Sequence, residues 1–196
     1  MSEILNAIRQ ACAAIDDADM ERARRIVRSC RMEPAASGAK VGAPSIKDRM
    51  RVFLRDGFID RYSGDRLVFP AALRILSLKM PDAFPFHEHW KMSECHIAYW
   101  HLLPTIDHVV PVSRGGTDDL DNLVSTSQLR NSAKGILLLE ELGWKLHSPG
   151  KLENWDGMLS WFFSHVGRHP ELLEEPYIRS WHRIAREMTD QDSLPG

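Results

Sequence analysis

The sequence predicts an α+β protein that is mainly helical, with a hairpin-and-helix unit in its middle and a helical arm at its N-terminus. Apolar residues recur at helical spacing through much of the chain. Residues 104–135 instead contain two short runs of β-branched and apolar residues around a turn rich in glycine and aspartate. A chain of 196 residues, 43% of them hydrophobic, is long enough for one substantial domain with an appendage.

The first 33 residues predict two short helices that form an accessory arm. Ile4, Leu5 and Ile8 begin an apolar helical stripe, and an aspartate cluster at residues 16–19 ends this helix and caps the next one. The second helix carries Arg22, Arg24, Arg25, Arg28 and Arg31. These arginines form either a surface that faces nucleic acid or, as the more ordinary alternative, a solvated face paired with nearby acidic residues. The arm is also a candidate for homodimer formation.

A linker and the main domain follow the arm. Residues 34–44 are rich in proline, alanine and glycine, which is typical of a flexible linker. The main domain is predicted over residues 45–188. It begins with a helix over residues 47–56, two short strands around a Ser-Gly-Asp turn within residues 58–69, and a helix over residues 70–80.

The C-terminal part of the chain predicts further helices. We expect the helix of the central unit to continue through residues 136–142, where four consecutive apolar residues suggest burial, until Gly143 ends it. Residues 155–166 and 170–188 follow as helices, whose aromatic residues at helical spacing indicate core. The polar tail, residues 189–196, is expected to be disordered.

The central unit, residues 104–135, predicts strand, loop, strand and helix. Pro111 ends the first strand, the turn over residues 114–119 reverses the chain, and an apolar pair at residues 123–124 begins the second strand. Ser125 or Thr126 is the expected N-cap of the helix. This arrangement gathers polar side chains from distant positions: Asp107, His108, Asn122 and Asn131.

These residue types suit the hydrolysis of a phosphodiester, which needs a general base and a cation that offsets developing negative charge. His108 can accept a proton from water, and Asp107 and Asn131 offer the hard oxygen ligands that Mg²⁺ accepts. Since adjacent side chains of a strand point to opposite faces, Asp107 and His108 share one site only if the strand ends or bends there. The candidates for binding phosphate oxygens are Arg114, Arg130 and Lys134.

The order of these residues resembles the HNH endonucleases. In that family Asp-His is followed by an apolar pair and proline, a Gly-Gly turn, Asn-Leu, and a helix with Asn or His ahead of Lys. The matching positions here are Asp107, His108, Pro111, Gly115, Gly116, Asn122, Leu123, Asn131 and Lys134. Because Asn131 stands where many members have histidine, the chain is similar to the Asn-terminated variant.

The resemblance implies a ββα-metal (His-Me finger) centre. It implies a catalytic set of His108, Asn122 and Asn131, in which His108 is the general base and Asn122 pins the loop between the strands. Asp107 and Asn131 would bind one divalent metal ion, Mg²⁺ or Mn²⁺. The function implied is that of a metal-dependent endonuclease, a hydrolase acting on DNA or alternatively RNA.

Two alternatives remain open at this point. One is a sequence-specific or structure-specific nuclease of restriction or recombination, and the other is a non-catalytic module that binds nucleic acid on the same scaffold. The net charge of −2 requires that any contact with DNA come from a local basic patch.

The cysteines and a second histidine cluster are the residues that could bind a structural metal ion. Many family members carry two Cys-x-x-Cys pairs that bind zinc, but Cys12, Cys30 and Cys95 form no such pair. We therefore expect no structural zinc, with the hairpin near residues 58–69 in its place. A second cluster is expected to pack among aromatic residues or line the substrate groove: His87, His89, Cys95, His96 and His101. The absence of a targeting or membrane segment predicts a cytoplasmic protein with no membrane partner.

Overall fold

The computed structural model describes residues 10, 14, 17, 19–29, 44–87 and 91–191. Most of the first predicted helix, most of the linker, His89 and the end of the tail lie outside the described residues. Contacts divide the chain into two units, Met1–Val41 and Gly42–Gly196. The two units are described separately.

The N-terminal unit contains helix α2 (Met20–Ser29), which confirms the helix expected there. Asp19 precedes it, and its side chain accepts a hydrogen bond from the backbone N–H of Arg22 at 2.9 Å. Asp19 therefore caps the helix, as the aspartate cluster predicts. Arg22, Arg24 and Arg25 are exposed, and Arg24 lies 3.9 Å from Glu21.

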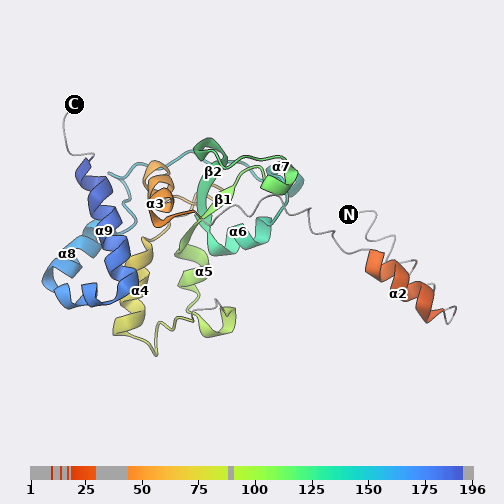
Figure 1. The fold of residues 1–196 in the computed structure, drawn as a ribbon, viewed down its shortest axis with the longest axis horizontal. Helices are drawn as coiled ribbons and strands as arrows, with labels where there is room; N and C mark the ends of the chain where they lie inside the picture. The colour runs from red at the N-terminus through yellow and green to blue at the C-terminus, as the bar shows by residue number, and fades with distance from the viewer. Residues whose placement is uncertain are drawn as a thin grey trace. The chain divides into compact units, whose positions relative to one another are not determined.

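The C-terminal unit is mainly helical with one small sheet, so the α+β prediction is confirmed (Figure 1). Its elements in chain order are α3 (Ile46–Arg55), α4 (Pro70–Lys79), η1 (Met92–Glu94), α5 (Ala98–Leu102), β1 (Pro104–His108), η2 (Val112–Arg114), η3 (Leu120–Asn122), β2 (Leu123–Ser127), α6 (Gln128–Lys134), α7 (Leu139–Leu142), α8 (Leu159–Arg168), η4 (Pro170–Glu174) and α9 (Pro176–Gln191). No helix in the described part of the chain is long and apolar enough to cross a membrane.

The sheet is an antiparallel pair of strands followed directly by a helix. β1 pairs with β2 in a register that runs from Pro104 opposite Ser127 to His108 opposite Leu123. Helix α6 starts at the residue after β2 and lies along the hairpin (Figure 1). The order strand, strand, helix brings the ends of β1 and α6 together, although 26 residues of chain separate His108 from Lys134.

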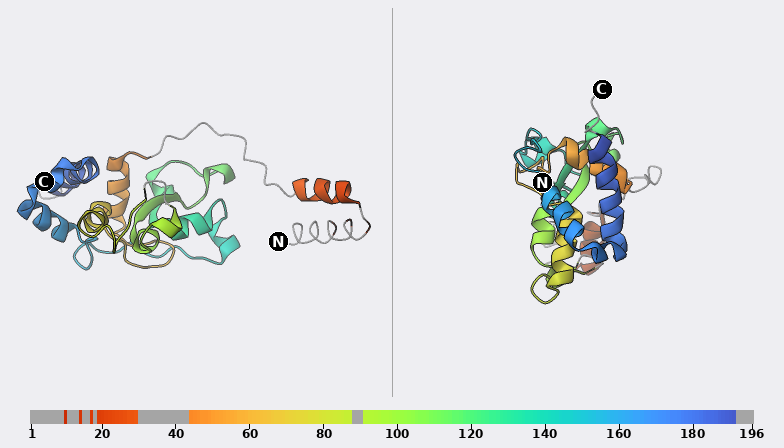
Figure 2. Two further views of the ribbon diagram at one scale, coloured as in Figure 1. Left: turned by 90° about the horizontal axis from the view of Figure 1, so that it is seen from below. Right: turned by 90° about the vertical axis from the view of Figure 1, so that its left-hand side faces the viewer.

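An aromatic core joins the helices that support this hairpin. α4, α8 and α9 gather at the other end of the unit, with α3 between them and the strands (Figures 1 and 2). Phe69 lies against Phe162 and Trp181, with ring centroids 4.9 and 5.6 Å away. Phe53 stacks on Trp181 at 6.1 Å. Because all four rings are buried, they are core residues, as their helical spacing indicates.

Residues 58–69 do not form the two strands that we predicted. The segment contains one isolated bridge, between Ile59 and Arg66, around the predicted turn. Within the segment, the N–H of Asp60 donates to Asp65 and that of Leu67 to Phe58, whereas the N–H of Arg61 donates to Ser125 and that of Val68 to Leu102. The segment is therefore a turn held in part by contacts with β2 and α5.

The predicted continuation of α6 through residues 136–142 is also wrong. Gly135 follows Lys134 with a φ of 52° and ends the helix, and a separate short helix, α7, forms after it. Ile136 and Leu137 are 41% and 39% exposed, so the apolar run is not buried. Four consecutive apolar residues cover all sides of a helix and do not define a buried face.

Three further boundaries differ from prediction. The N-cap of α6 is Ser127, whose hydroxyl accepts the N–H of Arg130, because Ser125 and Thr126 belong to β2. Helix α8 begins at Leu159, after Asp156 accepts the N–H of Ser160 at 2.8 Å. The region after residue 170 is a 3₁₀ turn followed by α9, which continues to Gln191 into the predicted tail.

Candidate active site

Two buried carboxylates fasten the second strand. Asp56 accepts hydrogen bonds from the N–H and the hydroxyl of Ser125, at 2.8 and 3.1 Å. Asp60 accepts the hydroxyl of Thr126 at 2.9 Å and the N–H of Ser127 at 2.8 Å. Together these bonds form a carboxylate clamp, Asp56 and Asp60, which holds β2.

The charge of the clamp is compensated at Asp56. The guanidinium groups of Arg55 and Arg61 lie 2.9 and 2.8 Å from its Oδ1 atom. A buried carboxylate is tolerated only when it is paired and hydrogen-bonded, and both conditions hold here. Sequence analysis missed the clamp, because aspartates beside a turn are ordinarily exposed.

Asp107 is held by a phenol and an ammonium group. Its Oδ2 atom accepts a hydrogen bond from the hydroxyl of Tyr62 at 2.7 Å and lies 2.9 Å from Nζ of Lys134. Burial raises the pKa of Tyr62, and the negative charge of Asp107 raises it further. Tyr62 therefore remains a protonated donor at neutral pH, and the carboxylate of Asp107 is fixed in place.

Lys134 occupies a different environment from the one we predicted. Its side chain is 0% exposed, and its ammonium group also donates to the backbone carbonyl of His108 at 2.7 Å. An ammonium group enclosed in this way cannot contact a phosphate in solution. The predicted phosphate contact of Lys134 is corrected to a structural role, in which Lys134 ties α6 to the end of β1.

His108 faces a second carboxylate. Its Nε2 atom lies 2.8 Å from Oδ1 of Asp118, in the loop between the strands. Because a carboxylate only accepts hydrogen bonds, Nε2 carries the proton and Nδ1 is left as an acceptor. β1 ends at His108, and the two neighbouring side chains diverge there: Asp107 contacts α6, and His108 contacts the loop.

Asn131 lies against the same strand. Its amide nitrogen donates to the hydroxyl of Thr105 at 3.0 Å and to the carbonyl of Ile106 at 3.2 Å. With both amide protons directed at β1, the amide oxygen is left as an acceptor. Asn131 and Lys134 are three residues apart, so they share the face of α6 that contacts β1.

Asn122 joins the two ends of the inter-strand loop. Its side chain accepts the N–H of Val110 at 2.9 Å and donates to the carbonyls of Val110 and Thr117 at 2.9 and 2.7 Å. Gly116 is needed in the same place, because a Cβ atom there would lie 1.8 Å from the carbonyl oxygen of Val110. These contacts fix the loop that carries Asp118.

The two predicted phosphate-binding arginines lie near α7. Arg114 pairs with Glu141 at 3.0 Å, and both side chains are partly exposed. The hydrogen bond from the N–H of Leu138 and the Arg114 guanidinium lower the pKa of Glu141. Arg130 lies over the ring of Trp144, 5.2 Å from its centroid.

The described members of the second histidine cluster differ in environment, and His101 is exposed. His96 stacks on Phe84 at 4.2 Å, and the N–H of His87 donates to the sulfur of Cys95 at 3.3 Å. Within residues 44–87 and 91–191, no three or more His, Cys, Asp or Glu side chains form a group that could hold a metal ion.

The site thus combines an oriented histidine with carboxylate and amide oxygens on a strand, strand, helix unit. Residues 93–134 match the HNH endonuclease family model, and the matched segment contains β1, β2 and α6. The predicted family resemblance is confirmed for this segment, and a match to this family suggests a nuclease. Searches of curated proteins and of solved structures gave no match.

Proposed function

We propose that this protein is a metal-dependent endonuclease that hydrolyses phosphodiester bonds in DNA. The observation that carries the proposal is the pairing of His108 with Asp118 on the same strand, strand, helix unit as Asp107 and Asn131, all within the segment that matches the family. We further propose that residues 45–188 form the catalytic domain and residues 1–33 an accessory arm.

His108 is the general base of the proposed reaction. Its Nδ1 atom accepts a proton from the attacking water, and the imidazolium that forms is stabilised by Asp118. Asp118 also fixes the ring orientation, a role that the third group of a catalytic triad performs in other hydrolases. The loop pinned by Asn122 keeps Asp118 within reach.

The donor set fits Mg²⁺ or Mn²⁺. Mg²⁺ is commonly bound by one or two protein carboxylates, with water and substrate phosphate as its other ligands. Asp107 retains a second carboxylate oxygen beyond the one that contacts Tyr62 and Lys134, and Asn131 offers its amide oxygen. When bound there, the ion would offset negative charge on the phosphate and on the leaving oxygen.

Phosphate contacts are proposed for Arg114 and Arg130. Arg114 lies in the loop between the two strands, and Arg130 lies in α6, directly after the hairpin. Arg114 is paired with a partly exposed carboxylate that a phosphate can replace, and Arg130 lies over an aromatic face. DNA is the proposed substrate, and RNA is the alternative that the assay below includes.

A plasmid-nicking assay tests the proposal. The purified full chain is expected to convert supercoiled plasmid to nicked product with Mg²⁺ or Mn²⁺, to stop with EDTA, and to resume when the metal is restored. His108→Ala, prepared in parallel, excludes a contaminating nuclease. A structured RNA is assayed beside the plasmid. Full-strength cleavage in EDTA contradicts metal dependence, and binding without cleavage under all conditions favours the non-catalytic module.

A further inference from the structure

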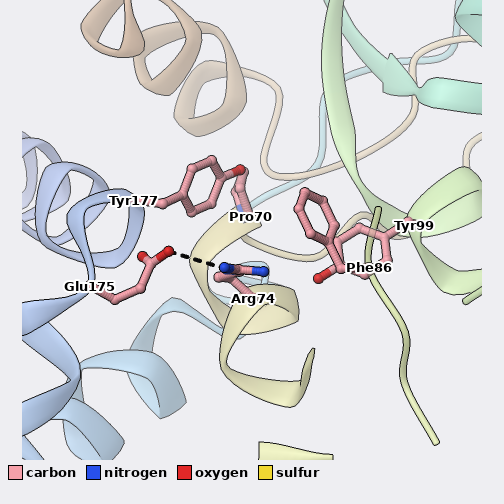
Figure 3. Close-up of a pocket in the computed structure, with 6 residues that line it drawn as sticks. All are labelled: Pro70, Arg74, Phe86, Tyr99, Glu175 and Tyr177. Carbon is pink, nitrogen blue, oxygen red and sulfur yellow. Dashed lines mark hydrogen bonds and ion pairs between the residues drawn. The ribbon is translucent and has the colours of Figure 1, made fainter. Parts of the chain in front are cut away.

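Two adjacent hollows lie in the C-terminal unit, and the larger one reaches β1. They share Pro70, Phe86 and Tyr177 in their walls. The smaller hollow has a volume of about 170 Å³ and is also lined by Arg74 and Glu175, which form an ion pair (Figure 3). The larger, about 560 Å³, extends to β1 and to the first residue of α6.

Aromatic faces line the larger hollow. Tyr177, which is 41% exposed as a residue, and Phe86, which is partly exposed, both line it. The guanidinium of Arg74 lies over Phe86, 4.9 Å from the ring centroid, and Arg74 is itself paired with Glu175 at 3.2 Å. Trp181 is almost fully buried and lines the hollow from below the surface. A flat ring entering the hollow therefore meets aromatic surfaces that are held in place.

The polar groups at the edge of the larger hollow have the chemistry of nucleotide recognition. Gln128, at the start of α6, carries an amide that can both donate to and accept from a nucleobase. Arg49 is exposed and belongs to the same wall. No carboxylate lines this larger hollow among the described residues, so its charge suits an anion.

The larger hollow is connected to the candidate active site through β1. Thr105 and Ile106 line it, and the same two residues accept the hydrogen bonds of the Asn131 amide. Asp107 is the next residue along the strand. Thr105 and Asp107 are about 7 Å apart along the strand at the usual rise per residue, a distance within the reach of neighbouring nucleotides.

We propose that the larger hollow binds an unpaired nucleotide of the DNA substrate next to the bond that is cut. Its base stacks against Tyr177 and Phe86, and its phosphate faces Arg49. A base inside a duplex is stacked and paired on all sides and must leave the helix to enter a concave site, whereas an unpaired base enters without that cost. The volume lies within the range of small-molecule sites. The proposal rests on the proposed nuclease function and assigns it a preference for single-stranded, gapped or frayed DNA.

Fluorescence anisotropy with the full-length His108→Ala protein tests this preference without cleavage. The probes are a labelled single-stranded oligonucleotide and the same sequence as a blunt duplex. In that background Tyr177→Ala is expected to weaken single-strand binding by about fivefold to a hundredfold, because one stacking partner is lost. Tyr177→Phe keeps the ring and should bind as the parent does. Leu152→Ala, which removes a large exposed apolar side chain elsewhere, is the matched control.

A second variant and a second signal guard against misfolding. Arg49→Gln should lower the salt dependence of single-strand binding by about 0.7 in the logarithmic slope. A 2-aminopurine placed in the oligonucleotide should be quenched on binding by the parent and less so by Tyr177→Ala. If neither variant changes binding while the wild-type chain still cleaves DNA, the hollow is not a nucleotide site and the nuclease function stands. If the wild-type chain neither binds nor cleaves DNA, both proposals are overturned.

Discussion

Replacing Lys134 with methionine tests the buried ion pair at the centre of the structure. The substitution keeps an unbranched apolar stem but removes the ammonium group that contacts Asp107 and the carbonyl of His108. The side chain of Asp107 is 12% exposed and contacts both Lys134 and Tyr62 in the wild type. In the variant only the hydrogen bond from the Tyr62 hydroxyl remains. The variant therefore tests whether Lys134 has a structural role or binds phosphate, as the sequence suggests.

The expected loss of stability follows from that environment. Removing one partner of a buried pair typically costs 3–5 kcal/mol, and the remaining bond from Tyr62 places this case near the lower end, at about 3 kcal/mol. For a unit of this size each kcal/mol lowers Tm by roughly 2–4 °C, so the variant should melt about 6–12 °C below the wild type.

Urea unfolding of both proteins provides the measurement. Lys145→Met, at an exposed lysine, is the control and should change stability by no more than about 0.5 kcal/mol. Adding Asp107→Asn to Lys134→Met should recover part of the loss, because no unpaired charge then remains. A Lys134→Met protein as stable as the wild type, with a shallower salt dependence of DNA binding, would refute the buried pair and restore the phosphate contact.

Three further predictions follow. Asp118→Ala should slow cleavage roughly tenfold to a hundredfold, because His108 loses the group that orients it, whereas Asp121→Ala in the same loop should not. Zinc chelation should leave the circular dichroism spectrum and cooperative unfolding unchanged, since the carboxylate clamp holds β2; loss of structure would contradict this. Burial, aided by nearby positive charges, lowers the pKa of His165. The unfolded chain therefore takes up the proton first, and stability should fall as pH drops below about 6.5. His165→Phe should show a smaller fall in urea titrations, and an equal fall would exclude His165.

The sequence predicts those elements of this protein that are determined by residues close together in the chain. Helices α3 and α4 lie within a residue of their expected bounds, because Ser45 and Pro70 are ordinary helix-start signals. The hairpin follows from a proline, two glycines and the β-branched runs on either side. Asn122 lies where the family pattern expects it, bonded across the loop.

The remaining features depend on contacts between distant segments. Nothing in the local sequence distinguishes a buried Lys134 from a solvated one, because its burial is caused by Tyr62 and Asp107, which lie 45 residues apart. Asp118 is one of several loop aspartates, and only the loop geometry selects it as the partner of His108. The apolar residues after Gly135 resemble a buried helix in the sequence, but α6 ends at Gly135, where the backbone φ is positive.

The roles of His108 and Asp107 are tested most directly by calorimetric metal titration, read beside nicking rates, of the wild type and three variants. His108→Ala should bind Mn²⁺ as the wild type does and cleave about a hundredfold to ten-thousandfold more slowly. Asp107→Asn, chosen because its amide oxygen can still accept hydrogen bonds from Tyr62 and Lys134, should lose both metal affinity and cleavage. Asn131→His should keep part of both, since imidazole also binds divalent ions. A His108→Ala protein that loses the metal while Asp107→Asn retains it would reverse the proposed roles, and unchanged cleavage by all three variants would show that this centre is not the active site.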